Sequence, residues 1–442
     1  MASIPSFSTA MILVLATILL FVSPACSANK EGANHHTEAH NGFRLSLKHV
    51  DSGKNLSRFE RLQHAMKRGR QRVKRFSAMV LAEKSDSKVK SPVHAGNGEF
   101  LMDLSIGTPP KPYTAIMDTG SDLIWTQCKP CKDCFDQSTP VFDPTTSSSF
   151  ANVSCTDKLC KALPRSRCSD GCEYLYTYGD SSLTQGFMAT ETFTFDKVSV
   201  PSIGFGCGLD NEGSGFSQGA GLVGLGRGPL SLVSQLKEPK FSYCLTSISD
   251  TITSTLLMGS LASVNSTDGA IITTPLIKNP SHPSFYYLTL QGITVGATLL
   301  PIEKSTFALS DDGSGGLIID SGTTITYLEE SGFDIVKKEF ISQVKLPVAD
   351  SSTTGLELCF NLPSDTSSIT VPSLIFHFDG ADLQLPGENY MVVDSSMGVL
   401  CLAMGSSNGM SIFGNIQQQN MLVLHDLEKE KLSFIPTKCS QM

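Results

Sequence analysis

The sequence predicts a mainly β protein of two related lobes with an active-site cleft between them. At 442 residues the chain exceeds one ordinary hydrophobic core, and its 40% hydrophobic and 17% charged residues are typical of a globular protein. Glycine (37 residues) and proline (22 residues) punctuate alternating runs such as EFLMDLSIG at 99–107, the pattern of strands and turns. A motif that recurs after 202 residues places one copy in each lobe.

The N-terminal residues have the pattern of a secretory signal peptide. An apolar run, MILVLATILLFV at 11–22, precedes small residues, which places the signal at 1–28. No Lys or Arg precedes the run, so a retained signal anchor is the alternative. No later stretch approaches the roughly 18 apolar residues of a membrane helix, so we expect no stable membrane span.

A basic segment follows the signal. Residues 29–95 contain 15 Lys and Arg against 6 Asp and Glu, a balance of +9, whereas residues 96–442 have a balance of −17. The block KRGRQRVKR at 67–75 and the helix-forming SRFERLQHAM predict a partly helical, basic propeptide over 29–90, cut between about residues 75 and 97. It would inhibit the acidic body by docking on it, and a merely solvated leader is the alternative. Because the chain is predicted to be secreted, nucleic acid is not an expected partner.

The body divides into an N-terminal lobe over 91–260 and a C-terminal lobe over 261–442. Most of it alternates in the manner of strands, and helical patterns are few. The clearest helix is predicted over 331–344, with Ser331 as a candidate cap and with Phe333, Val336, Phe340 and Ile341 on one side. A shorter helix is predicted over 228–236.

The repeated motif carries one aspartate in each copy. DTGSDLIW at 118–125 aligns with DSGTTITY at 320–327, and each copy is followed downstream by an apolar element ending in glycine, GLVG at 221–224 and SIFG at 411–414. Two copies related by a pseudo-two-fold axis would bring Asp118 and Asp320 together. Each lobe would then supply half of one site.

Two adjacent carboxylates have a specific chemistry. Like charges in a poorly solvated site disfavour double ionisation, so the pair would share a proton, one acid activating water and the other protonating a carbonyl oxygen. Glycines let the backbone approach the acids, and hydroxyl residues orient them or bond across the lobe junction. The expected supporting residues are Thr119, Gly120, Ser121, Ser321, Gly322 and Thr323.

With both acid motifs present, the sequence resembles the pepsin-like aspartic peptidases, most closely the nepenthesin-like branch found in plants. The resemblance covers roughly residues 97–442 and implies a bilobal pepsin-like fold, a zymogen, and secreted endopeptidase activity at acidic pH without a cofactor. The dyad of this family exemplifies the shared-proton chemistry. YTYGDSS at 176–182 resembles the family's substrate-covering flap. Its cleft residues would be Tyr178, Gly179 and Asp180, with Trp125 bonding the tyrosine.

The cysteines indicate disulfides. Cys26 falls in the signal, which leaves 12 of 13 cysteines for six bridges in an oxidising compartment. The C-x2-C-x2-C spacing at 128–134 would suggest metal in a cytosolic chain, but no metal is expected here. The resemblance implies the pairs Cys128–Cys131, Cys134–Cys207, Cys155–Cys172, Cys160–Cys168, Cys244–Cys439 and Cys359–Cys401.

Other functions have less support. Some secreted relatives with this fold inhibit glycan-degrading enzymes, but they typically lose catalytic residues or the flap. No H-E-x-x-H pattern or G-x-S-x-G elbow favours a metallopeptidase or serine peptidase, and GLGRG at 224–228 is interpreted as lobe core. We expect an extracellular monomer acting on proteins or peptides, with a vacuolar location as the alternative. Asn152 and Asn265 are candidate glycosylation sites.

Overall fold

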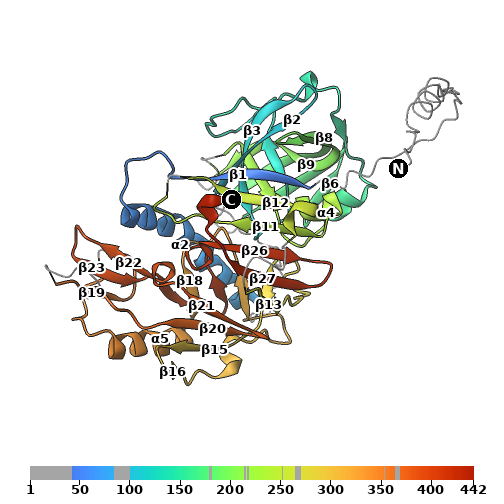
Figure 1. Cartoon of the computed structure of the whole chain (residues 1–442). Helices are drawn as coiled ribbons and strands as arrows, with labels where there is room; N and C mark the ends of the chain where they lie inside the picture. Colours follow the sequence, from blue (N-terminus) through green and yellow to red (C-terminus); the bar gives the residue numbers. More distant parts are fainter. Residues whose placement is uncertain are drawn as a thin grey trace, which may run out of the picture. The chain divides into compact units, whose positions relative to one another are not determined.

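Most regular structure in the protein is β-strand, as the alternating sequence predicts (Figure 1). Residues Asn41–Met442 form one compact unit. The expected signal peptide lies outside the described residues, within which no helix is long and apolar enough to cross a membrane. The computed structural model describes residues 42–83, 100–178, 182–213, 216, 219–250, 252–263, 270–352, 354–363 and 369–442.

The largest sheet has fifteen strands and joins the leader to both lobes. Its order is β13-β27-β26-β11-β12-β1-β2-β3-β10-β4-β9-β8-β7-β6, with β5 paired to β8. The strands are β1 (Phe43–His49), β2 (Phe100–Ile106), β3 (Lys111–Asp118), β4 (Trp125–Gln127), β5 (Ala151–Asn152), β6 (Ser166–Cys168), β7 (Cys172–Thr177), β8 (Leu183–Phe195), β9 (Val198–Glu212), β10 (Gly221–Gly224), β11 (Lys240–Cys244), β12 (Ser254–Met258), β13 (Ile272–Pro275), β26 (Met421–Asp426) and β27 (Lys431–Pro436).

Three smaller sheets belong to the C-terminal lobe. The five-stranded sheet contains β14 (Tyr286–Leu288), β17 (Leu317–Ile319), β25 (Ser411–Phe413), β18 (Thr326–Glu329) and β24 (Met404–Ser407) in that order. The four-stranded sheet contains β16 (Thr298–Leu299), β15 (Leu290–Val295), β20 (Leu374–Phe378) and β21 (Ala381–Leu385). The three-stranded sheet contains β19 (Cys359–Asn361), β23 (Val399–Leu402) and β22 (Met391–Asp394).

Within the described residues the helices are short, except for α2 and α5. The α-helices are α2 (Arg58–Glu83), α3 (Lys158–Lys161), α4 (Leu232–Leu236) and α5 (Glu330–Gln343), and 3-10 turns are η1 (Pro144–Thr146), η3 (Gly259–Ala262), η4 (Lys304–Phe307), η5 (Gly387–Asn389), η6 (Ile416–Gln418) and η7 (Cys439–Gln441). In α5 the predicted cap was wrong, because the Glu329 carboxylate accepts from the backbone N–H of Ser331. Ile341, placed with the apolar side of this helix by the sequence, is 41% exposed, whereas Phe333, Val336 and Phe340 are buried.

The sequence repeat is a structural repeat. β3 runs parallel to β10, with Asp118 opposite Gly224, and β17 runs parallel to β25, with Ile319 opposite Phe413. In each copy the eighth residue of the motif pairs with the apolar–glycine strand, Trp125 with Leu222 and Tyr327 with Ile412. Both aspartates therefore lie at the carboxyl end of a strand whose neighbour is parallel.

The leader is built into the body. β1 is hydrogen-bonded between β12 and β2, with Leu47 opposite Ser254 and Met102 (Figure 1). The helix α2 that follows contacts β22 and β24 of the C-terminal lobe. Its buried apolar side chains are Phe59, Leu62, Ala65, Met66 and Val73, which pack with C-terminal-lobe residues such as Tyr327 and Ile412.

The disulfides differ from four of the six expected pairs. β4 and β9 run parallel with Thr126 opposite Cys207, so Cys128, just beyond β4, bonds Cys207 and leaves Cys131 to bond Cys134. In the insert, Cys168 and Cys172 lie opposite each other on β6 and β7, with Cys155 bonding Cys168 and Cys160 bonding Cys172. The structure thus replaces Cys128–Cys131, Cys134–Cys207, Cys155–Cys172 and Cys160–Cys168, and it contains Cys244–Cys439 and Cys359–Cys401 as expected.

One buried histidine on β26 lies in the sheet that joins the lobes. The ring of His425 stacks on Phe241 at 4.3 Å and meets the edge of Tyr286 at 4.6 Å, with Tyr243 at 5.6 Å. No side chain among the described residues hydrogen-bonds either ring nitrogen. Burial, aided by the charge of Arg227, lowers the pKa of His425 to about 3.

We predict that His425 limits stability in acid. Below pH 6.5 the unfolded chain protonates this histidine while the folded chain does not until about pH 3, so the free energy of unfolding falls as pH falls through that window, by up to roughly 4 kcal/mol. His425→Phe keeps an aromatic ring and removes this proton uptake. In thermal unfolding, the melting temperature of the variant relative to that of the wild type should rise as pH is lowered from 7 to 4. A difference in melting temperature that does not change with pH would contradict the prediction.

Candidate active site

Asp118 and Asp320 are fully buried at the ends of β3 and β17 and receive the same set of hydrogen bonds. The Ser121 hydroxyl donates to Asp118 Oδ2 at 2.5 Å, and the Thr323 hydroxyl donates to Asp320 Oδ2 at 2.6 Å. The other oxygen of each carboxylate, Oδ1, accepts from the backbone N–H two residues on, at 3.0 Å. Those amides belong to the two predicted glycines, Gly120 and Gly322.

The two motifs bond directly to each other. The backbone N–H of Ser321 donates to Thr119 Oγ1 at 3.1 Å, and the hydroxyls of these two residues are also 3.1 Å apart. The Thr119 hydroxyl further reaches Asp320 Oδ1 at 3.4 Å. All eight residues predicted to form and support the dyad therefore lie together. The hydroxyls fix which carboxylate oxygens remain free to face one another.

A residue of the leader lies between the carboxylates. Arg72 of α2 is fully buried, and its Nη2 donates to Asp118 Oδ1 at 2.8 Å and to Asp320 Oδ1 at 2.7 Å, while Nε donates to Asp320 Oδ2 at 2.7 Å. Burial alone would lower the pKa of Arg72, but the charges and hydrogen bonds of both aspartates outweigh it and raise the pKa. A Cβ atom at residue 322 would lie 2.7 Å from Arg72 Nη1, so Gly322 also makes room for the guanidinium.

The expected flap contact is present. The Trp125 indole N–H donates to the Tyr178 hydroxyl at 2.8 Å, and Phe216 packs edge-on against both rings. Burial raises the pKa of Tyr178 well above its ordinary value, with smaller contributions from Tyr176 and Asp118, so its hydroxyl stays protonated. Gly179 and Asp180, also predicted for the flap, lie outside the described residues.

Three further polar residues near the dyad were not predicted from the sequence. The Gln418 side chain donates to the backbone carbonyl of Asp320 at 3.3 Å, and that of Asn415 donates to the carbonyl of Ser321 at 3.0 Å. Asp122 lies buried one residue after the first DTGS motif. Its position directly after that motif was the available signal, but only the fold shows what it contacts.

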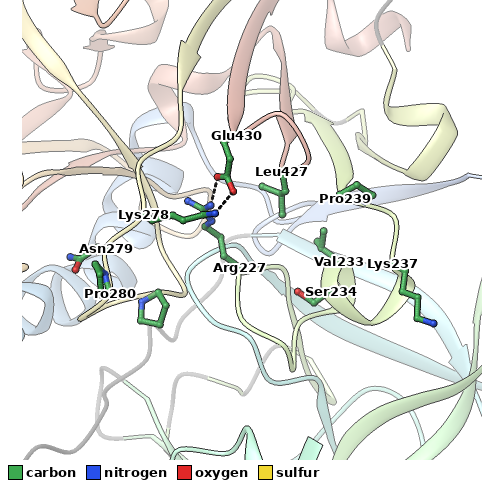
Figure 2. A pocket seen from close by; sticks show the side chains of 11 residues that line it. Arg227, Val233, Ser234, Lys237, Pro239, Lys278, Asn279, Pro280, Leu427 and Glu430 are labelled. Atoms are coloured by element: carbon green, nitrogen blue, oxygen red, sulfur yellow. Dashed lines mark hydrogen bonds and ion pairs between the residues drawn. The ribbon is translucent and has the colours of Figure 1, made fainter. Parts of the chain in front are cut away.

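A cavity of about 630 Å³ lies apart from the dyad. Figure 2 shows its lining, in which Arg227 and Lys278 are both directed at Glu430. Its walls come from residues 227–239 of one lobe and from residues 278–283 and 427–430 of the other. Neither aspartate of the dyad lines it, so we assign it no part in catalysis.

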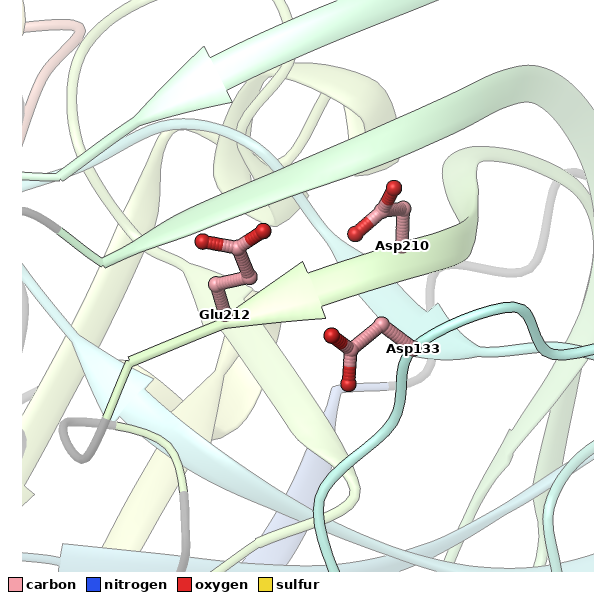
Figure 3. A group of neighbouring side chains, drawn as sticks. All are labelled: Asp133, Asp210 and Glu212. Atoms are coloured by element: carbon pink, nitrogen blue, oxygen red, sulfur yellow. The ribbon is translucent and has the colours of Figure 1, made fainter.

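One acidic group has the spacing of a cation site. Asp133, Asp210 and Glu212 have ligand atoms within 4.8 Å of one another, and Figure 3 shows them around the end of β9. Lys132 already binds Asp210 Oδ2 at 3.0 Å and supplies a positive charge there. We therefore assign no metal to this group. The cysteines at 128, 131 and 134, where the spacing raised a metal alternative, are all in disulfides.

Comparison with known proteins gives relatives along nearly the whole chain. Residues 100–260 match the family model described as Xylanase inhibitor N-terminal, and residues 285–436 match Xylanase inhibitor C-terminal. The chain is 54% identical to aspartic proteinase nepenthesin-1 of Nepenthes gracilis, covering 97% of this chain and 98% of that protein. It is 50% identical to nepenthesin-2 of the same plant, with the same coverage.

Solved structures show the same fold at lower identity. The structure described as edgp superposes with a TM-score of 0.63 at 20% identity, covering 90% of this chain and 96% of that one. Soybean Basic 7S globulin gives a TM-score of 0.61 at 21% identity, covering 78% and 96%. Since at least half of its residues match each of two aspartic proteinases over nearly its full length, this chain belongs to the pepsin-like aspartic peptidases, in the nepenthesin-like branch, and is an aspartic-type endopeptidase.

Proposed function

We propose that the chain is the zymogen of a secreted endopeptidase that hydrolyses peptide bonds at acidic pH through a water activated by Asp118 and Asp320. The observation that carries the proposal is the matched pair of buried carboxylates bridged by one guanidinium nitrogen. That nitrogen occupies a position where a hydrogen-bond donor contacts both acids at once. Once the leader has left, a water can take this position.

The dyad then has one proton to share. The ionised carboxylate takes a proton from the water as its oxygen bonds to the scissile carbonyl carbon, and the protonated carboxyl gives its proton to the carbonyl oxygen. Breakdown of the tetrahedral intermediate returns a proton to the leaving amine and leaves an acid and an amine as products. No enzyme atom becomes covalently bound. Ser121 and Thr323 would hold the outer oxygens so that the inner ones face the water.

The flap would close this site. Tyr178 lies on the hairpin of β7 and β8, and its hydroxyl is held by Trp125. We propose that Tyr178, with Gly179 and Asp180, covers the bound peptide and excludes bulk water, which strengthens each electrostatic contact in the cleft.

The leader would keep the enzyme inactive by three attachments. β1 occupies a place in the main sheet, the apolar face of α2 covers the C-terminal lobe, and Arg72 neutralises the dyad. A turn between β1 and α2 is fixed by buried Asp51, which accepts from Lys54 at 2.6 Å and Arg68 at 2.8 Å. Among the basic residues at 67–75 whose side chains the structure describes, Arg72 contacts the dyad, so a specific contact is proposed in place of the predicted diffuse charge attraction.

Acid would release the leader. Protons neutralise the carboxylates that hold it, while Arg72, whose pKa is raised, keeps its charge. Burial would raise the pKa of Asp51, but its bonds to Lys54 and Arg68 outweigh this and lower it. The Asp51 contribution is therefore present above pH 3.8 and is lost only as pH falls through the lowered pKa, so the leader's own turn should persist well into acid.

Secretion is supported by the six disulfides and by the apolar N-terminal run, with an extracellular location proposed and a vacuole as the alternative. Asn152 is exposed on β5 and is proposed as a glycosylation site, whereas Asn265 lies outside the described residues. We propose a monomer, since both catalytic acids come from one chain.

An inhibitor of glycan-degrading enzymes is the competing function, because both matching family models are described as xylanase inhibitor domains. The complete dyad and the Tyr178–Trp125 contact support the peptidase instead. Incubating the acid-treated protein with a denatured protein at acidic pH separates the two, since an inhibitor would leave the protein uncut.

Asp118→Asn and Asp320→Asn should each lower kcat by a factor of about 10³ or more, because each removes half of the proton-sharing pair. The leader should be removed from these variants by an added peptidase, since they are not expected to process themselves. Near-normal cleavage by either purified variant would show that the dyad mechanism is wrong.

Arg72→Gln should shift self-activation toward neutral pH, because removing one partner of a buried ion pair costs about 3–5 kcal/mol. The full chain is followed by activity and N-terminal sequencing as pH is lowered from 7 to 3. Lys67→Gln, on an exposed residue of the same helix, is the matched control and should activate like the wild type. Equal activation pH for both variants and the wild type would exclude Arg72 as the switch.

Tyr178→Ala should lower kcat/KM about 10- to 100-fold while the protein still folds, because the cleft loses its cover. Tyr178→Phe keeps the ring and loses only the bond from Trp125. Its kcat/KM should lie between those of Tyr178→Ala and the wild type. Unchanged cleavage by Tyr178→Ala would show that this hairpin is not the lid.

A further inference from the structure

A buried carboxyl that the dyad chemistry does not use lies four residues after Asp118. Asp122 is 7% exposed, and its two oxygens have partners from different lobes. The backbone N–H of Gly228 donates to Oδ1 at 2.8 Å. The Ser284 hydroxyl donates to Oδ2 at 2.5 Å. The side chain therefore joins the segment after β10 to the segment before β14.

Each partner is coupled to one catalytic strand. Gly228 follows β10, which runs parallel to β3 and pairs Gly224 with Asp118. Ser284 precedes β14, which is antiparallel to β17 and pairs Tyr286 with Ile319, the residue before Asp320. A short chain of hydrogen bonds thus runs from one aspartate to the other through Asp122, separate from the direct contact of Thr119 with Ser321.

The GLGRG segment at 224–228 is shaped around this joint. A Cβ at Gly226 would lie 2.3 Å from Asp122 Oδ1, and one at Gly228 would lie 2.1 Å from Oδ2, so only glycine leaves room for the carboxyl. The backbone N–H of Arg227 donates to the Ser284 carbonyl at 3.1 Å. The Tyr286 hydroxyl donates to the carbonyl of Leu225. These contacts account for a glycine pattern that resembles a phosphate loop only in sequence.

The surroundings favour a neutral carboxyl. Burial raises the pKa of Asp122, the bonds from Ser284 and Gly228 oppose the rise, and the nearby charge of Asp118 adds to it. Tyr176 and Tyr286 also face it, and burial raises the pKa of each well above the ordinary value, so both remain uncharged. The guanidinium of Arg227 is directed at Glu430, which also binds Lys278 (Figure 2).

The corresponding position of the second motif is different. Thr324 follows the DSGT motif of the C-terminal lobe where Asp122 follows DTGS. A Cβ at Gly69 of the leader would lie 3.4 Å from Thr324 Oγ1, so this position faces the leader helix and not the lobe junction. The joint therefore exists on one side of the pseudo-two-fold axis.

We propose that Asp122 is a positioning residue whose carboxyl bonds both lobes and so fixes the separation of Asp118 and Asp320. The proposal rests on the proposed function of that pair. Oδ2 accepts from the Ser284 hydroxyl while Oδ1 accepts from the Gly228 N–H, so one carboxyl holds a segment of each lobe. In its ionised form a second negative charge is buried near Asp118, which destabilises the joint as pH rises.

Three variants of the full chain, activated in acid, test this with a peptide substrate. Asp122→Ala removes both bonds and should lower kcat roughly 10- to 100-fold with KM changed less than about threefold, because the dyad is misplaced while the subsites remain. Asp122→Asn keeps an acceptor for Gly228 and a donor for Ser284 and should restore most of that loss. Asp379→Asn, an acid-to-amide change in an exposed turn, is the control and should match the wild type.

A second readout separates positioning from simple loss of folding. The activated enzymes are incubated across pH 3–8 and then assayed at the acidic optimum. The wild type and Asp379→Asn should share one pH of half-inactivation. Asp122→Asn, which cannot ionise, should be half-inactivated at a pH higher by roughly one unit or more.

The proposal is overturned if Asp122→Asn is as impaired as Asp122→Ala at the optimum, or if its half-inactivation pH equals that of the wild type. If the Asp122 variants yield no folded protein, Ser284→Ala removes the same bond from the other lobe. This variant should lower kcat several-fold, and an unchanged kcat would overturn the proposal. Failure of the proposed function is distinguishable, because it would appear as an inactive wild type or an active Asp118→Asn.

Discussion

Two carboxylates buried side by side are the constraint on which the rest of this structure depends. A buried charge without compensation is costly, and two like charges are more so. The fold meets this constraint with repeated local chemistry, since each aspartate ends a strand, accepts a backbone N–H, and is bound by a hydroxyl three residues on. What remains is a shared negative site between the lobes that requires either a cation or a proton.

The negative charge of the pair can therefore be compensated in two alternative ways, by the leader's arginine or by a proton. Arg72 supplies a cation with a planar fork that reaches both carboxylates, which the point charge of a lysine would do less well. Acid supplies a proton instead. Because β1 is a strand of the main sheet and α2 covers an apolar surface, leader release also requires rearrangement of backbone pairing, so latency has more than one layer.

The sequence predicted those features of the fold and the site that short motifs determine. The two acid motifs, the apolar–glycine element after each and the leader helix follow from short motifs and their order, and the family resemblance implied the Tyr178–Trp125 contact. Four disulfide pairs were wrong, because neighbouring cysteines such as Cys131 and Cys128 compete for partners that only strand register decides. Arg72 was not singled out because it is one of several basic residues at 67–75. Its burial against both aspartates distinguishes it, and that is a property of the fold. Asp122 was missed because its partner Ser284 lies 162 residues away.

The pH dependence of kcat/KM for the activated wild-type enzyme tests the central claim most directly. Initial rates on a substrate without titrating groups should be taken quickly enough that inactivation near neutral pH does not contribute. A pair that works with one shared proton requires a bell-shaped profile, because activity falls both when the pair gains a second proton and when it loses the first. A profile with a single limb, governed by one ionisation across pH 2–8, would contradict the account.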